Sequence, residues 1–231
     1  MTNAVQTAYT HAFILASLPA VARRILEIGC GDGALAECLV RDGYEVLAID
    51  AEAGCVAAAR ERGIEARLAE WPAPVDGTFD AVLFTRSLHH VHDLEGGIAA
   101  AGAALRPGGR VVVEDFRAEG GSERSADWYR AMVGELADGD ALADDASVAA
   151  LLDKLPPAVH GGHELHSSSA IRDALSGYFT ISEEDAAYYF RYVEPHLREP
   201  VAAKWLLEVE LEQIVAGEID ALGKRFTGSA N

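Results

Sequence analysis

The residues best suited to binding chemistry form a glycine-rich turn near the start of the chain. In the segment RRILEIGCGDGALAECLV, Glu27 is followed by Gly29, Gly31 and Gly33 at alternate positions. Glycine permits positive φ angles and allows a ligand to approach the backbone closely. An apolar run precedes the turn and an amphipathic helical pattern follows it, and the free N–H groups of a helix N-terminus favour an anionic group. The segment therefore predicts a ligand-binding turn between a strand and a helix.

Other side chains further along favour an adenosyl ligand for this turn. Asp50 ends the apolar run YEVLAID, where a carboxylate can accept both hydroxyls of a ribose. Glu70 and Trp71 supply an acceptor for an exocyclic amine and a flat apolar wall. Dinucleotide-binding turns usually carry G-x-G-x-x-G and receive a pyrophosphate. Here the third glycine comes one residue early, and Glu27 would disfavour a pyrophosphate but favour an ammonium or a sulfonium.

The elements that must position these residues alternate between strand-like and helix-like patterns. This alternation predicts a parallel sheet covered by helices. The expected strands are short and rich in aliphatic residues: Ile25–Ile28, Glu45–Ile49, Ala66–Leu68, Ala81–Phe84 and Arg110–Glu114. The expected helices end near glycine or proline: Ala34–Arg41, Glu52–Glu61 and Leu94–Leu105.

The pattern changes after Phe116. Loops and polar helices are expected first, followed by a helix starting near Ser168. The segment GYFTISEEDAAYYFRYV alternates as a late strand and its extension would. Val201–Leu222 predicts a long amphipathic helix, and GKRFTGSA predicts a closing strand.

The chain shows no internal repeat and no low-complexity linker, so a single domain over residues 1–231 is expected. Its expected parts are an N-terminal helix or cap over 1–20, a cofactor-binding core over 21–116, and substrate-side insertions with closing strands over 117–231.

The composition of the chain restricts which kinds of molecule it can bind. The net charge of -18 repels phosphate backbones and anionic membranes, so a small molecule is expected rather than a nucleic acid or a membrane. The three cysteines form no C-x-x-C pair, which fits a reducing compartment. No basic signal-peptide start and no apolar run of membrane-spanning length occur, so we expect a cytoplasmic protein.

Five segments in order resemble the class I S-adenosylmethionine-dependent methyltransferases: LEIGCGDG, AID, AEW, FDAVLFTRSLHHV and LRPGGRVVVED. The resemblance covers about Arg24 to Asp115. It implies a doubly wound, Rossmann-like α/β fold with a seven-stranded sheet, mostly parallel with an antiparallel last strand. Helices on both faces and inserted helices forming a substrate cap are implied as well. The implied reaction moves a methyl group from S-adenosyl-L-methionine to an O, N, S or C nucleophile of a small molecule, leaving S-adenosyl-L-homocysteine.

The resemblance also implies which residues bind the cofactor. Glu27 and the turn would face the methionine moiety, Asp50 the ribose, and Glu70 with Trp71 the adenine. Glu70 stands where the family more often has Asp. The full expected set is Glu27, Gly29, Cys30, Gly31, Asp50, Ala51, Glu70, Trp71, Thr85, Arg86 and Leu88.

Candidates for catalysis and substrate binding are fewer. His89 and His90 follow the fourth expected strand and are the nearest general bases, although one of them packing and the other capping a loop is the structural alternative. The residues expected to bind substrate are Tyr9, His11, His163, Tyr189 and Arg191. For the segment AYYFRY, core packing with a surface arginine is the structural alternative. The segment HGGHELH holds three histidines, but its glycines oppose a helix that would align them, so no metal site is expected.

Three alternative functions stay open from the sequence. The same cofactor fold can host chemistry other than methyl transfer. A nicotinamide-dependent oxidoreductase is disfavoured by Glu27 and by the early third glycine, and a non-catalytic binding module is weaker still because the glycines and Asp50 are all present. The sequence does not assign an oligomeric state.

Overall fold

The computed structural model describes residues 4–154 and 165–230 and divides into two compact units. The first, here called the sheet unit, comprises Tyr9–Asp115, His166–Glu184 and Arg225–Asn231. The second, here called the helical unit, comprises Met1–Ala8, Phe116–Leu165 and Asp185–Lys224. Each unit has its own packing and is described by itself.

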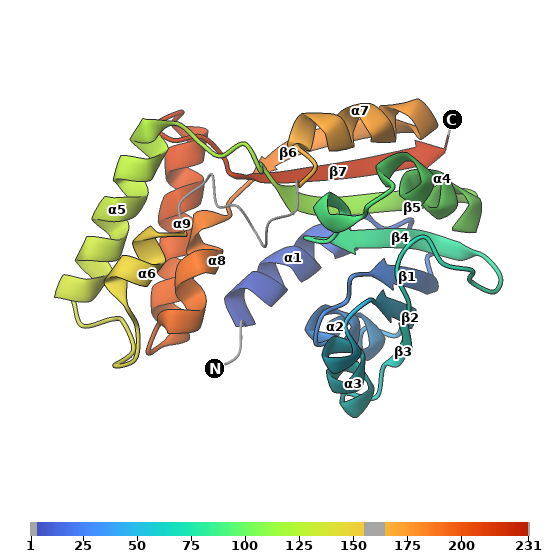
Figure 1. Cartoon of the computed structure of the whole chain (residues 1–231), viewed down its shortest axis with the longest axis horizontal. Coiled ribbons are helices and arrows are strands. Elements are labelled where there is room, and N and C mark those ends of the chain that lie inside the picture. The colour runs from blue at the N-terminus through green and yellow to red at the C-terminus, as the bar shows by residue number, and fades with distance from the viewer. Residues whose placement is uncertain (1–3, 155–164, 231) are drawn as a thin grey trace. The chain divides into compact units, whose positions relative to one another are not determined.

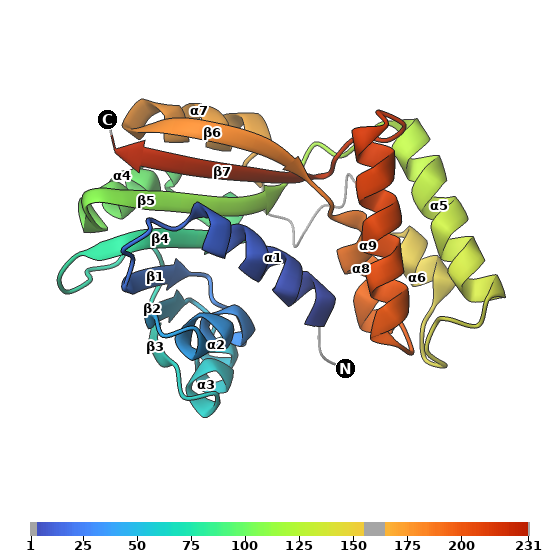
Figure 2. The same ribbon diagram turned by 180° about the vertical axis from the view of Figure 1, so that it is seen from behind.

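A seven-stranded sheet organises the sheet unit (Figure 1). Its order is β3-β2-β1-β4-β5-β7-β6, with parallel pairing from β3 through β5. Six strands run parallel and the last one, β7, runs antiparallel, which confirms the predicted fold class (Figure 2). The strands are β1 Arg24–Ile28, β2 Glu45–Asp50, β3 Glu65–Leu68, β4 Phe79–Thr85, β5 Leu105–Phe116, β6 Phe179–Ala186 and β7 Gly223–Ala230.

Helices cover both faces of this sheet because the strands are apolar on both sides. In β1, Leu26 and Ile28 join one apolar cluster with α4 and α7, whereas Ile25 joins the other cluster with α1, α2 and α3. The helices are α1 Ala4–Ser17, α2 Ala34–Arg41, α3 Ala53–Glu61, α4 Leu94–Ala104 and α7 Ser168–Tyr178. The predicted helices of this region are confirmed to within one residue at each end.

The parallel strands place four loops at one edge of the sheet. The loops after β1, β2, β3 and β4 all leave from carboxyl ends, where open α/β sheets bind their ligands. The loop after β4 includes a short 3-10 turn, η1, at Leu88–His90. The glycine turn, Asp50 and the histidines therefore come from different strands to the same edge.

The helical unit contains α5 Glu123–Asp138, α6 Val148–Leu152, α8 Tyr189–Val193, η2 Glu194–His196 and α9 Pro200–Val215. Aromatic rings form its centre: Tyr129 lies 5.5 Å from Tyr189 and 6.3 Å from Tyr192, measured between ring centroids. The fully buried Glu210 of α9 accepts hydrogen bonds from the backbone N–H groups of Tyr188, Tyr189 and Phe190. Burial raises the pKa of Glu210 to about 7.

Two predictions in this unit are wrong. The segment AYYFRY alternates as a strand would, but its backbone forms α8 because Glu210 satisfies the free N–H groups at the helix start. The predicted helix Val201–Leu222 ends at Val215, and Gly217 follows with φ +71°, a conformation that terminates helices. The predicted closing strand is confirmed as β7.

Across the two described stretches of the chain, every helix falls short of the length and apolar character that crossing a membrane requires.

Candidate active site

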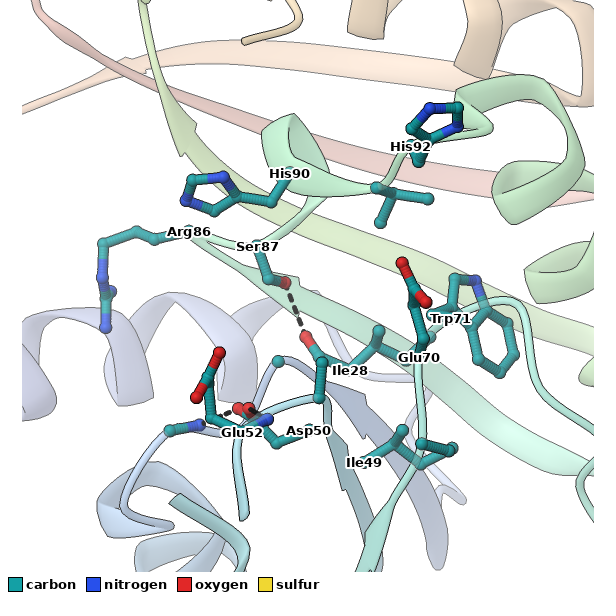
Figure 3. A pocket seen from close by; sticks show the side chains of 15 residues that line it. Ile28, Ile49, Asp50, Glu52, Glu70, Trp71, Arg86, Ser87, His90 and His92 are labelled. Carbon is teal, nitrogen blue, oxygen red and sulfur yellow. Dashed lines mark hydrogen bonds between the residues drawn. The ribbon is translucent and has the colours of Figure 1, made fainter. Parts of the chain in front are cut away.

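A pocket of about 430 Å³ opens at the carboxyl edge of the sheet, within the sheet unit (Figure 3). All four loops that leave this edge contribute to its wall. The lining residues are Ile28, Gly29, Gly31, Ile49, Asp50, Ala51, Glu52, Ala69, Glu70, Trp71, Arg86, Ser87, His90, Val91 and His92.

The three glycines of the turn have positive φ angles but serve different purposes. A Cβ on Gly29 would lie 2.3 Å from Cβ of Ser87, and one on Gly33 would lie 2.8 Å from Cβ of Ala59. These two glycines allow close packing inside the protein. A Cβ on Gly31 would meet no described atom within 4 Å, although Gly31 lines the pocket. The space above Gly31 is therefore open to a ligand.

Asp50 ties the glycine turn to the loop after β2. Its Oδ2 accepts a hydrogen bond from the N–H of Gly31 at 2.8 Å, and its Oδ1 accepts one from the N–H of Glu52 at 2.9 Å (Figure 3). Each carboxylate oxygen has a second lone pair, so Asp50 can still accept hydroxyl donors from a ligand.

Glu27 is a buried carboxylate with an unsatisfied oxygen. It is 1% exposed on β1, and its Oε1 accepts from the Thr85 hydroxyl at 3.5 Å. Its Oε2 has no hydrogen-bond partner among the described residues. Burial raises the pKa of Glu27 to about 8, and the nearby Arg86 guanidinium opposes part of that rise. A buried acceptor of this kind needs a donor, and a cationic group would supply one.

The wall after β3 is formed by Glu70 and Trp71. Glu70 is exposed, and Trp71 is 7% exposed because its indole belongs to the core of the sheet unit. The indole Nε1–H donates to the carbonyl of Gly97 in α4 at 2.9 Å, which holds the ring in place. The carboxylate and the aromatic residue that the sequence predicted thus both line the pocket.

Four predicted cofactor residues, Glu27 among them, lie beside the pocket without lining it. Thr85 is buried and donates its hydroxyl to Oε1 of Glu27, and Leu88 is fully buried in the core. Cys30 is also buried, and burial raises the pKa of its thiol to about 12, so this cysteine is unreactive at neutral pH. Ala51 and Arg86 do line the pocket.

The two adjacent histidines have different environments. His90 is exposed and lines the pocket, whereas His89 is only 3% exposed. His89 Nδ1 lies 2.6 Å from Oδ1 of Asp115, and the His89 backbone N–H donates to Oδ2 of the same carboxylate at 3.2 Å. The two imidazole rings are 4.0 Å apart between centroids. Asp115 therefore orients His89, which packs against the ring that faces the pocket.

Sequence reasoning did not single out Asp115, Glu52, Ser87 or His92 for the site. Asp115 is the last residue of the segment LRPGGRVVVED. Its position near the end of a strand is the sequence feature that could have identified it as a site residue. Glu52, Ser87 and His92 adjoin predicted positions and line the pocket because their loops fold over it.

Four of the predicted substrate-binding residues make contacts elsewhere. In the sheet unit, His11 Nε2 lies 2.7 Å from Oδ2 of Asp42, and the Tyr9 ring lies 4.0 Å from the guanidinium carbon of Arg225. In the helical unit, Tyr189 is 1% exposed, and the buried Arg191 donates to the carbonyl of Gln6 at 3.5 Å. None of the four lines the pocket of the sheet unit.

His163 lies outside the described residues. Among the residues that are described, no three His, Cys, Asp or Glu side chains are grouped so that they could hold a metal ion.

The fold and the site together define a class I, Rossmann-like methyltransferase. The methyltransferase domain family matches residues 4–147, and the chain belongs to this family.

Curated relatives are similar to part of the chain. A ubiquinone biosynthesis O-methyltransferase of Xylella fastidiosa (strain 9a5c) is 36% identical over 114 residues, which cover 44% of this chain and 45% of that protein. The protein of the same name from Methylocella silvestris is 40% identical over 94 residues, covering 37% of each. The matched region thus spans less than half the length of these relatives.

Solved structures share the fold over nearly the whole chain. A SAM-dependent methyltransferase of Thermotoga maritima, described as a possible histamine N-methyltransferase, has a TM-score of 0.58 at 14% identity, covering 99% of this chain and 91% of that one. Phosphoethanolamine N-methyltransferase 2 of Haemonchus contortus, solved with S-adenosyl-L-methionine, has a TM-score of 0.59 at 16% identity. The match covers 96% of this chain and 52% of that one. At these identities the likeness shows the fold alone.

Proposed function

We propose that this protein transfers a methyl group from S-adenosyl-L-methionine to an O, N, S or C nucleophile of a small molecule. One observation carries the proposal: the buried Oε2 of Glu27, which has no partner among the described residues, lies beside a turn whose Gly31 leaves open space. That combination fits a ligand with a cationic end and disfavours a pyrophosphate. Membership of the methyltransferase domain family supports the same conclusion.

The residues in and beside the pocket form groups that suit the parts of the cofactor. Glu27 would accept from the ammonium, and Gly29 and Gly31 leave room for the methionine chain. Asp50 would accept from the ribose hydroxyls, and Glu70 with Trp71 would border the adenine. When bound, the cofactor supplies an activated methyl group on a sulfonium, and positioning of the acceptor provides most of the rate enhancement.

The histidines supply proton transfer for an acceptor that must lose a proton. His90 lines the pocket and would accept that proton, since a neutral imidazole has a ring nitrogen that can act as a base. His89 acts as a positioning residue: the Asp115 carboxylate holds the proton of His89 on Nδ1 and fixes the ring beside His90. This division of roles follows from burial, because His89 is almost inaccessible to a ligand in the pocket.

A small-molecule acceptor fits both the charge and the relatives. A net charge of -18 opposes polyanionic partners such as nucleic acids. The names of the relatives include both O- and N-methyl transfer, so acceptors of both kinds belong in the assay.

Calorimetric titration of the purified protein with S-adenosylmethionine, S-adenosylhomocysteine and NAD tests the proposed cofactor. We expect micromolar binding of the two adenosyl compounds and none of NAD. Binding of NAD alone would overturn the proposal in favour of an oxidoreductase.

Methyl transfer itself is tested with isotopically labelled cofactor and a panel of phosphoethanolamine, histamine and a demethylated ubiquinone precursor. A methylated product formed together with S-adenosylhomocysteine supports the proposal. Consumption of the cofactor without a methylated product would point to the non-methylating alternative. With an active acceptor, His90→Ala should lower kcat by about 10²-fold or more, and Asp115→Asn should lower it less while cofactor affinity is retained.

A further inference from the structure

The turn that carries the paired histidines is a short piece of 3-10 helix whose conformation depends on contacts from outside it. Within η1, the N–H of His90 donates to the carbonyl of Ser87, and the N–H of Val91 donates to the carbonyl of Leu88, each at 3.1 Å. These two bonds leave the carbonyls of His89 and Val91 to partners elsewhere in the protein. A 3-10 turn of three residues is weak by itself, so such partners decide how firmly it keeps its shape.

His166, which directly precedes the N-cap of α7, supplies a donor to both of these carbonyls. Its backbone N–H donates to the carbonyl of His89 at 3.3 Å, and its ring Nε2 lies 2.9 Å from the carbonyl oxygen of Val91. A carbonyl oxygen can only accept, so Nε2 carries the proton and donates it. The two anchored residues flank His90 in the sequence. His166 therefore bridges the turn across the histidine that lines the pocket (Figure 3).

His166 is itself held in place by the start of α7. The hydroxyl of Ser167 accepts from the N–H of Ala170 at 3.2 Å and so caps this helix. Ile171 of α7 is fully buried in the same apolar cluster as Leu88 of the turn. The residue that holds the turn is thus tied to the core into which the turn packs, within the sheet unit.

Asp115 of β5 holds the same turn through other groups. Its Oδ2 accepts from the backbone N–H of His89, and its Oδ1 lies 2.6 Å from Nδ1 of the same residue. Asp115 therefore engages the donors of His89, and His166 engages the carbonyls of His89 and Val91. Because the turn is held from both β5 and the start of α7, the backbone that carries His90 is restrained at the wall of the pocket.

We propose that His166 is a positioning residue for methyl transfer: it holds η1 so that the ring of His90 stays where it can take a proton from the methyl acceptor. The inference rests on the proposed function, in which His90 is the general base. It gives a role to one histidine of the segment HGGHELH. A misplacement of about 1 Å can lower a rate by about 10²-fold, so losing one anchor should reduce kcat although the base itself is still present.

Amide hydrogen exchange, measured by NMR on the isotopically labelled protein, tests the anchor without any acceptor. In His166→Ala the amides of His90 and Val91 should exchange about tenfold faster, the effect of losing one hydrogen bond, whereas the amide of Leu83 in the buried strand β4 should keep its rate. His166→Gln places an amide N–H near the position of Nε2–H and should restore most of the protection. The matched control is His196→Ala, which removes a half-buried histidine from the helical unit and should leave all three rates unchanged.

A double-mutant cycle tests the link to catalysis. With whichever of phosphoethanolamine, histamine and the demethylated ubiquinone precursor is methylated, His166→Ala should lower kcat about tenfold and change the KM for S-adenosylmethionine less than about threefold. In the His90→Ala background the same substitution should have no further effect, because the side chain that it positions is gone. A role confined to folding would instead lower activity by the same factor in both backgrounds.

Unchanged exchange of the His90 and Val91 amides in His166→Ala would overturn the anchor. An equal acceleration at Leu83 would do so as well, since the variant would then be destabilised as a whole. Equal losses of kcat with and without His90 would overturn the positioning role and leave the proposed function standing. Failure of the wild-type protein to bind S-adenosylhomocysteine would overturn the proposed function and the role in methyl transfer together, while amide exchange would still report whether His166 holds the turn.

Discussion

The buried carboxylate of Glu27 should make cofactor binding depend on pH. Its pKa is raised to about 8, so the free protein holds a proton on Glu27 at neutral pH. An ammonium bound at Oε2 requires the ionised carboxylate, and the proton must then leave. Binding of a ligand that carries an ammonium should therefore strengthen as pH rises toward 8 and release a proton.

The size of the effect follows from the pKa. The apparent dissociation constant scales with 1 + 10^(8−pH), so it should fall about ninefold between pH 6 and pH 7. The same titration acts on folding: the unfolded carboxyl has a pKa of 4.5, so the native state binds the extra proton between the two values. The contribution of Glu27 to stability is therefore largest at low pH and declines as pH rises through this window.

Calorimetric titration with S-adenosylhomocysteine at pH 6 and pH 7, repeated in buffers of different ionisation enthalpy, measures both the affinity and the released proton. The control ligand is 5′-methylthioadenosine, which lacks the ammonium and should show no such dependence on Glu27. The variant Glu27→Gln should bind S-adenosylhomocysteine more weakly and with a flat pH profile. Equal pH slopes for the two ligands, or an unchanged slope in Glu27→Gln, would refute the reasoning.

Other predictions concern the turn and the helical unit. Asp50→Ala should weaken S-adenosylhomocysteine binding by about 1–3 kcal/mol in calorimetry. The substitution removes the acceptor of two backbone N–H groups and the proposed acceptor of the ribose hydroxyls. An unchanged dissociation constant would remove Asp50 from the site. In urea unfolding, Gly29→Ala should destabilise the protein more than Gly31→Ala, because only the first adds a clash with Ser87 to the strain of a positive φ. Gly31→Ala should instead weaken ligand binding, and the reverse ranking would overturn the placement of the turn. Glu210→Ala should cost about 3 kcal/mol or more in the same assay, since three N–H groups lose their acceptor, and a cost near zero would contradict the capping role.

The order of strands and helices around the site was predictable because its signals are local. Short aliphatic runs, amphipathic helices and terminating glycines all act within a few residues, and they placed β1, β2, β4, α2 and α4 to within a few residues of their observed bounds. The same runs carried the resemblance that implied the fold. Glu27, Gly31 and Asp50 were recognisable because their residue types, at a strand end, already restrict the ligand.

Contacts between residues far apart in the sequence determined the backbone conformation and burial of one segment that its local pattern mispredicted. The alternation in AYYFRY predicted a strand, yet Glu210, far along the chain in α9, caps the segment as a helix. The alternation left substrate binding and core packing open for Tyr189 and Arg191, and packing in the helical unit buries both side chains. A period of two residues describes a local preference, and a buried cap from another element outweighs it.

The amino-acid sequence by itself determined the class of fold, the glycine turn and the types of residue gathered at the edge of the sheet. Only the tertiary structure decided where each of them lies. It paired His89 with Asp115, placed His90 in the lining of the pocket, and held Nη1 of Arg86 on Glu114. The physical reason is that burial and hydrogen bonding depend on residues from separate strands, whose distances no local pattern records.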